Sequence, residues 1–319
     1  MSNLDRSPAI RLGGGRAEVA TKPVKQLFAG REVALGESTV VRRLLPNLGR
    51  RLVGPWCFVD HYGPDDIAGA GGMAVPPHPH IGLQTVSWLL AGDVHHQDSI
   101  GSDQVIQPGQ LGLMTAGRGI AHAEHSPVPH PAMLHGVQLW VALPDTARHV
   151  EPQWSHHPSP PVVAADRMTV IVIIGELAGK RSPGHAYSPI VGADIALASG
   201  ADSALVVEPD FEYAVLTMSG ALEIDGVELT PGAMLYLGCG RRELRLASRA
   251  GARVMLLGGE PFAEQIVMWW NFVARTSEEI AAARSDWVAR RFGSVAAEGP
   301  LPAPPLPAGT LKPGGSVRR

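Results

Sequence analysis

Short apolar runs separated by turn-forming residues dominate the chain from about residue 33 onward. In the first half these runs occupy residues 38–41, 56–59, 85–90, 104–106, 111–114 and 137–141. Gly-Asp, Gly-Ser-Asp and Pro-Gly sequences lie between them, and such residues supply the backbone angles that tight turns need. Because the runs recur at a spacing of roughly 8–12 residues with no helical period between them, they predict an antiparallel sandwich or barrel.

A second strand series follows a proline-rich stretch at residues 151–161, which we interpret as a linker. It occupies residues 168–174, 203–207, 213–218, 222–224, 234–237, 242–246 and 253–257. In both halves a strand ends at a glycine, a hairpin follows, and a Pro-Gly pair opens the next strand. The glycines are Gly92 and Gly220, and the prolines are Pro108 and Pro231. This echo predicts two related β-domains in tandem.

The two ends of the chain have a different character. Residues 1–24 hold three successive glycines and little apolar content, which predicts a flexible leader. Thr276 and Glu279 have the spacing of a capping box, and Ile280, Ala283 and Trp287 follow at helical spacing, so we expect an amphipathic helix packed on a barrel. The proline-rich residues 294–319 predict a solvated, extended tail. The expected units are residues 1–24, 25–157, 158–293 (with the helix) and 294–319.

Composition narrows the class of protein. The 319 residues are 45% hydrophobic and 18% charged, which is globular composition. A formal net charge of −3 gives no electrostatic basis for direct nucleic-acid binding. Two widely separated cysteines are too few for a disulfide framework or a thiolate zinc site. The first residues lack the apolar core of a signal peptide, and the longest aliphatic run, residues 170–174, is too short to span a membrane. We therefore expect a cytoplasmic protein.

The histidines concentrate the candidate chemistry in the first half. All 13 lie between His61 and His185, so the second half is expected to serve structure or recognition. The doublets at residues 95–96 and 156–157 stand in polar, turn-like surroundings, and we interpret them as solvated loop residues.

Two short segments carry a metal-ligating pattern. His78-Pro79-His80 stands directly before the strand predicted at residues 85–90, and His122-Ala123-Glu124 repeats the same spacing. In an extended chain residues i and i+2 point to the same face, so three imidazoles and one carboxylate can meet inside one barrel. Nitrogen and oxygen ligands without thiolate suit one divalent ion of Fe, Mn, Co, Ni, Cu or Zn.

The sequences around these pairs resemble a known family. HPHIGLQTV at residues 78–86 and MTAGRGIAHAEHS at residues 114–126 closely resemble the signature sequences of the pirin family, a group of all-β bicupins. Segments at residues 45–61 and 261–280 are also similar, so the resemblance covers about residues 25–290. It implies two antiparallel cupin (jelly-roll) barrels in tandem. It also implies that His78, His80, His122 and Glu124 bind a metal, usually iron, in the first barrel. Quercetin 2,3-dioxygenase activity occurs in several members, and transcriptional co-regulation in a eukaryotic one.

Two departures from a symmetric bicupin stand out. Many cupins place Glu four residues after the second histidine, whereas this chain has Gln84; with Glu124 as ligand, Gln84 need only be a neighbouring pocket residue. Counting from the Pro-Gly and glycine markers places Arg245, Val206 and Glu208 where the first half has His122, His78 and His80. The second barrel is therefore expected to be degenerate, with no metal site.

These features favour a metal-dependent dioxygenase, with Fe(II) as the expected ion. It would open a flavonol ring with O2 and release carbon monoxide, the reaction that the resemblance implies. Glu124 is then either the base that accepts the phenolic proton or a ligand alone. His125 could support the site or be exposed, and Arg118 could shape the pocket rim or be a surface charge.

Two other functions fit the same residues. One is a non-catalytic metal-binding protein that senses redox state or regulates through an interaction surface. The other is zinc-dependent isomerisation or hydrolysis, because the ligand types alone do not separate zinc from iron. The expected partners are a small aromatic substrate and O2; the sequence is also compatible with a protein partner, and it gives no indication of a membrane or of nucleic acid.

Overall fold

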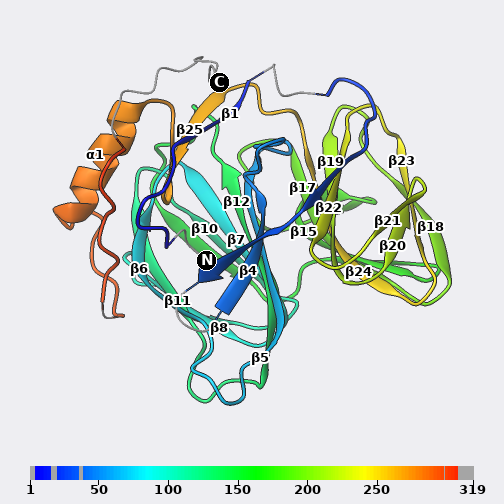
Figure 1. Ribbon diagram of the computed structural model, residues 1–319, viewed down its shortest axis with the longest axis horizontal. Coiled ribbons are helices and arrows are strands. Elements are labelled where there is room, and N and C mark those ends of the chain that lie inside the picture. The colour runs from blue at the N-terminus through cyan, green and yellow to red at the C-terminus, as the bar shows by residue number, and fades with distance from the viewer. Residues whose placement is uncertain (1–3, 16–19, 36–38, 298, 308–319) are drawn as a thin grey trace.

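The computed structural model describes residues 4–15, 20–35, 39–297 and 299–307. The chain is an all-β protein with one helix near its C-terminus (Figure 1), as the apolar runs predict. The helix, α1 (Ser277–Val288), has 12 residues, and no helix in the described ranges is long and apolar enough to cross a membrane.

The first half consists of two sheets that enclose the candidate site. The larger sheet has seven strands in the order β13 (Gln153–His157), β10 (Leu111–Thr115), β7 (Leu83–Ala91), β12 (Met133–Ala142), β5 (Trp56–Asp66), β4 (Thr39–Leu45) and β3 (Arg31–Leu35). The smaller sheet has the order β6 (Ala74–His80), β11 (Ile120–His125), β8 (Val94–Asp98) and β9 (Asp103–Ile106). This pairing of a large and a small antiparallel sheet fits the expected cupin arrangement.

The second half repeats the arrangement. Its larger sheet has the order β14 (Val162–Ala165), β15 (Met168–Leu177), β17 (Ile190–Leu197), β24 (Ala252–Gly259), β19 (Glu212–Gly220), β22 (Ala233–Gly238) and β2 (Gln26–Ala29), with β16 (Lys180–Arg181) paired to β15. Its smaller sheet has the order β18 (Ala201–Val206), β23 (Glu243–Ser248), β20 (Leu222–Ile224) and β21 (Val227–Leu229). An apolar cluster fills the space between these two sheets.

The two large sheets pack against each other through a shared apolar cluster. Val86 and Trp88 of β7 join Ile173 of β15 and Leu216 of β19 in this cluster. The Trp88 indole Nε1 also donates to the Asp194 carboxylate of β17, at 2.8 Å. Because side chains alternate along a strand, the even-numbered residues of β7 face the second half, and the odd-numbered ones face the interior of the first half.

Both ends of the chain pair differently from our expectation. Within the expected leader, β1 (Arg11–Gly14) pairs with β25 (Gln265–Trp269), which continues to β26 (Phe272–Ala274). Strand β2 pairs with β22 of the second half. The chain ends therefore cross between the halves, a pairing that local composition does not encode.

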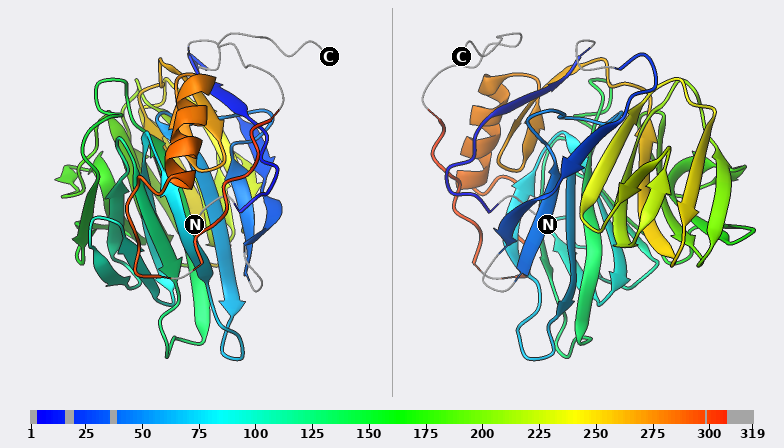
Figure 2. Two further views of the ribbon diagram at one scale, coloured as in Figure 1. Left: turned by 90° about the vertical axis from the view of Figure 1, so that its left-hand side faces the viewer. Right: turned by 45° about the vertical axis from the view of Figure 1, so that its right-hand side comes forward.

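Helix α1 begins at the predicted capping box, with Thr276 accepting from the Glu279 backbone and the Glu279 side chain accepting from Thr276. It packs beside the first half and far from the second half's small sheet (Figures 1 and 2). The expected solvated tail is wrong for its described part. The indole of Trp287 donates to the carbonyl of Leu301, and the Leu301 amide donates to the carbonyl of Pro77 in β6. Apolar side chains among the prolines let this segment pack on α1.

Candidate metal centre

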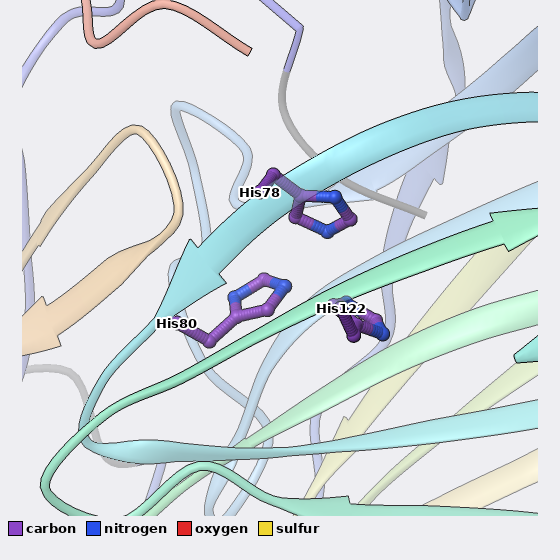
Figure 3. A group of neighbouring side chains, drawn as sticks. All are labelled: His78, His80 and His122. Carbon is purple, nitrogen blue, oxygen red and sulfur yellow. The ribbon is translucent and has the colours of Figure 1, made fainter. Parts of the chain in front are cut away.

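Strands β6 and β11 place the predicted pairs on one face. They are antiparallel, with His78 opposite His122 and His80 opposite Ile120. Strand β6 is at the edge of its sheet, which is where a strand tolerates the prolines that surround its histidines. Figure 3 shows His78 and His80 projecting from β6 toward His122 on the neighbouring strand.

The three imidazoles form a compact buried group. Their ring centroids lie 4.9 Å (His78–His80), 4.3 Å (His78–His122) and 5.0 Å (His80–His122) apart, and all three side chains have 0% exposure. One possible ligand atom from each lies within 4.8 Å of the others.

Each ring presents the same nitrogen to the group. His78 Nδ1 lies 2.8 Å from the carbonyl oxygen of Pro76, and His80 Nδ1 lies 2.9 Å from that of Asn271. A carbonyl only accepts, so both rings carry their proton on Nδ1 and leave Nε2 with a free lone pair. Within the described ranges of the chain, the Nε2 atoms of all three histidines are buried without a hydrogen-bond partner. Because such atoms are costly to bury, this donor set fits a divalent metal ion.

Burial also holds these imidazoles in the form that binds metal. Burial lowers the pKa of His78 to about 4, against the raising effects of its Pro76 hydrogen bond and of Glu124. Burial, followed by the neighbouring histidines, lowers the pKa of His80 and of His122 well below the ordinary value. All three rings are therefore neutral at pH 7, as ligation requires.

Glu124 lies on the same face as His122, past a register shift in β11. Its carboxylate is buried, and Oε1 lies 3.1 Å from the Ser87 hydroxyl of β7. That hydroxyl also lies 2.9 Å from the side-chain oxygen of Gln138, so its single proton serves one of the two acceptors at a time. Glu124 forms a second group of potential ligands with His122 and His96. His122 therefore belongs both to the group of three predicted histidines and to the group that contains the predicted carboxylate.

His96 is the residue of this site that the sequence analysis missed. The interpretation of the doublets as solvated loops is wrong: residues 95–96 lie in β8 and residues 156–157 in β13. His96 is buried beside His122, whereas His95 faces outward and pairs with Asp103. Strand alternation was the available signal, since His96 and Asp98 are two residues apart and share the inward face.

Three other residues considered from the sequence lie away from the imidazole group. Gln84 faces the second half, where its amide donates to the Thr115 hydroxyl at 2.9 Å and to the His185 carbonyl at 3.0 Å. Arg118 is an exposed surface charge paired with Glu151. His125 is partly exposed and contacts His95.

The corresponding small sheet of the second half has leucines on its inward face. The counted positions Val206 and Arg245 lie outside its core: Val206 is exposed, and Arg245 forms an exposed ion pair with Asp202. Leu205 and Leu244, which lie opposite each other, face the apolar core instead. Among the described residues, the groups of side chains that could hold a metal all lie in the first half.

Comparison with known proteins gives consistent matches along the chain. The family model described as Pirin matches residues 38–141, and the Pirin C-terminal cupin domain matches residues 192–293. A Pseudomonas aeruginosa protein provisionally named a quercetin 2,3-dioxygenase is 46% identical over 88% of this chain and 90% of its own length. Human Pirin is 32% identical over 84% of this chain and 93% of its own length. The crystal structure of an Acinetobacter baumannii quercetin 2,3-dioxygenase, 40% identical, superposes with a TM-score of 0.87 over 90% of this chain and 97% of that chain.

Proposed function

This chain belongs to the pirin family, and we propose that it is a metal-dependent dioxygenase that opens a flavonol ring with O2 and releases carbon monoxide. The observation that carries the proposal is the buried group of three imidazoles whose Nε2 atoms have no hydrogen-bond partner among the described residues. Relatives named for quercetin 2,3-dioxygenase activity supply the substrate class.

We assign one divalent metal, Fe(II) in our proposal, to His78, His80, His122 and Glu124. The three neutral rings offer lone pairs, and the carboxylate offers the negative charge that partly neutralises the ion. Imidazole and carboxylate donors suit a non-haem iron site. Four protein ligands would leave about two positions of an octahedral ion open for substrate and O2.

The chain's own residues prepare the reaction. A bound divalent ion would supply Lewis acidity toward the flavonol hydroxyl and, as iron, redox chemistry with O2. Glu124 would accept the proton that leaves this hydroxyl, and its Oε1 shares the Ser87 hydroxyl proton with the side-chain oxygen of Gln138. Trp140 packs edge-on against the His80 ring, with centroids 5.1 Å apart. This apolar contact keeps the ring oriented and limits water beside it.

The test is flavonol turnover on protein of known metal content, with the gas phase analysed for carbon monoxide. We expect stoichiometric metal, turnover faster than the free ion gives, and one carbon monoxide per flavonol consumed. His80→Ala should lose metal and turnover together, whereas the matched control His149→Ala, at an exposed position, should keep both. Full metal occupancy without turnover would contradict the enzyme and favour a non-catalytic metal-binding protein.

A further inference from the structure

His96 is held in a fixed position beside the three-histidine group. Its ring stacks on Trp154 of β13, with centroids 3.7 Å apart and planes 7° from parallel. Its Nδ1 lies 3.3 Å from Nδ1 of His122, and its Nε2 lies 3.1 Å from Oδ2 of Asp98. Both His96 and Asp98 are buried. The three side chains form a line of hydrogen-bonding atoms that ends at a proposed metal ligand.

Asp98 is itself fixed by the backbone. Its other oxygen, Oδ1, accepts from the amide of Ile100 at 3.1 Å and from that of Ser102 at 2.9 Å. Oδ2 is therefore the oxygen left for His96. A carboxylate only accepts, so Nε2 of His96 must carry a proton to make this contact.

For the neutral form of His96, the proton positions along the line follow from that contact. This form carries one proton, so with Nε2–H it has a lone pair on Nδ1. The facing Nδ1 of His122 must then be the donor, and the proton of His122 is on that atom. This leaves Nε2 of His122 as a lone pair, as in His78 and His80. The partners of those two rings are carbonyl oxygens, which can only accept a hydrogen bond. An imidazole nitrogen can either donate or accept, so the role of His96 Nδ1 depends on its contact with Asp98.

We propose that Asp98 and His96 are positioning residues that fix the ligating tautomer of His122. Orientation of a metal-bound histidine through its second nitrogen typically changes metal affinity by 10- to 100-fold. Here the acceptor for His122 is a second histidine, His96. The Asp98 carboxylate therefore sets the proton position of His122 through the intervening His96 ring. This inference rests on the proposed metal site and extends it to His96 and Asp98, which lie outside the proposed ligand set.

Asp98→Asn is a nearly isosteric substitution that tests this role, because it should move the proton of His96 from Nε2 to Nδ1. The backbone amides of Ile100 and Ser102 retain the side-chain oxygen, so the new NH2 group faces Nε2 of His96 and makes it an acceptor. The proton of His96 then moves to Nδ1 and opposes Nδ1–H of His122. We expect Zn²⁺, titrated calorimetrically into metal-free full-length protein, to bind on the order of 10- to 100-fold more weakly.

The matched control uses the neighbouring histidine of β8, His95, whose partner Asp103 lies on β9. His95 Nε2 pairs with Asp103 Oδ1 at 2.5 Å on the outer face, so Asp103→Asn makes the same chemical change away from the site. It should leave Zn²⁺ affinity unchanged. His96→Phe preserves a ring against Trp154 but removes the acceptor of His122, and it should weaken Zn²⁺ binding even if Asp98→Asn does not fold.

The tautomer itself provides a second measurement. Long-range ¹⁵N–¹H spectra of metal-free protein, with His122 assigned by its loss in His122→Gln, should show the proton on Nδ1 in the wild type and on Nε2 in Asp98→Asn. Zn²⁺ affinity of the folded variants within twofold of wild type, or an unchanged His122 tautomer, would overturn the positioning role. Failure of the wild-type protein to bind Zn²⁺ at all would instead refute the proposed metal site.

Discussion

Replacing Gln84 with Glu tests how the departure from the common cupin motif is accommodated. The Gln84 amide is fully buried on the face of β7 that meets the second half. It donates to two acceptors, the Thr115 hydroxyl at 2.9 Å and the His185 carbonyl at 3.0 Å. A carboxylate has no proton for either contact and would place negative charge against the carbonyl oxygen. We expect the introduced carboxyl to remain protonated in the folded protein.

The free energy needed to keep this carboxyl protonated sets the size of the expected destabilisation. An unfolded Glu has a pKa of about 4.3, so keeping the group neutral at pH 7 costs up to about 3.7 kcal/mol. A protonated carboxyl donates one hydrogen bond where the amide donates two, which costs about 1 kcal/mol more. Because the folded pKa is raised, the folded state binds more protons than the unfolded state above pH 4.3. The stability of the Gln84→Glu variant relative to wild type therefore falls as pH rises.

The assay is urea unfolding of Gln84→Glu and wild type at matched pH. We expect the variant to be less stable by up to about 4.7 kcal/mol at pH 7 and by about 1.6 kcal/mol at pH 4.5. Metal content should be unchanged, because the amide contacts Thr115 and His185 rather than the histidine group. Gln107→Glu, at an exposed position, is the control and should shift stability by less than about 0.5 kcal/mol. An equal loss at both pH values would refute the reasoning, because the loss would then not come from a buried carboxyl.

Three further outcomes are expected. Glu124→Gln should weaken metal binding, and if Glu124 is the base, turnover per bound metal should fall by about 10²–10⁴-fold; a rate per metal within a few-fold of wild type would leave it as a ligand only. Deletion from Gly299 onward should lower the melting temperature by a few degrees, because Leu301 leaves its apolar cluster; an unchanged value would show that this contact adds no stability. Burial lowers the pKa of His61 to about 3 and of His135 to about 4. The unfolded chain therefore binds more protons below about pH 6.5, so wild-type stability should fall from pH 6.5 to 4 in urea unfolding, by up to about 1.4 kcal/mol per pH unit for each added proton.

Local patterns predicted the parts of this fold that local interactions determine. The apolar runs predicted the strands because alternation and turn residues act over a few positions. Thr276 and Glu279 predicted the start of α1 because a capping box is formed within one helical turn. The two short pairs placed three histidines and one carboxylate on adjacent strands, since residues two apart share a face whatever the register.

Pairing between distant segments explains what the sequence analysis missed. Strand β1 looked like a loose leader because its partner β25 lies about 250 residues later. The tail looked solvated because its few apolar residues, Leu301 among them, have no period, yet they have a surface on α1. His96 looked like a loop residue because its strand is short and polar; its burial depends on Trp154 from another sheet. In each case the stabilising contact is nonlocal.

The same distinction applies within the metal centre. The ligand motif places three imidazoles together, but each needs a different acceptor to present Nε2. His78 finds it two residues away, at Pro76, whereas His80 uses Asn271, which lies 191 residues later in the chain, between β25 and β26. His122 uses His96, which depends in turn on Asp98. Residues 265–274 thus contribute an acceptor to a site whose proposed ligands all lie in the first half. A segment from the second half of the chain therefore orients one of the histidines of the proposed metal site.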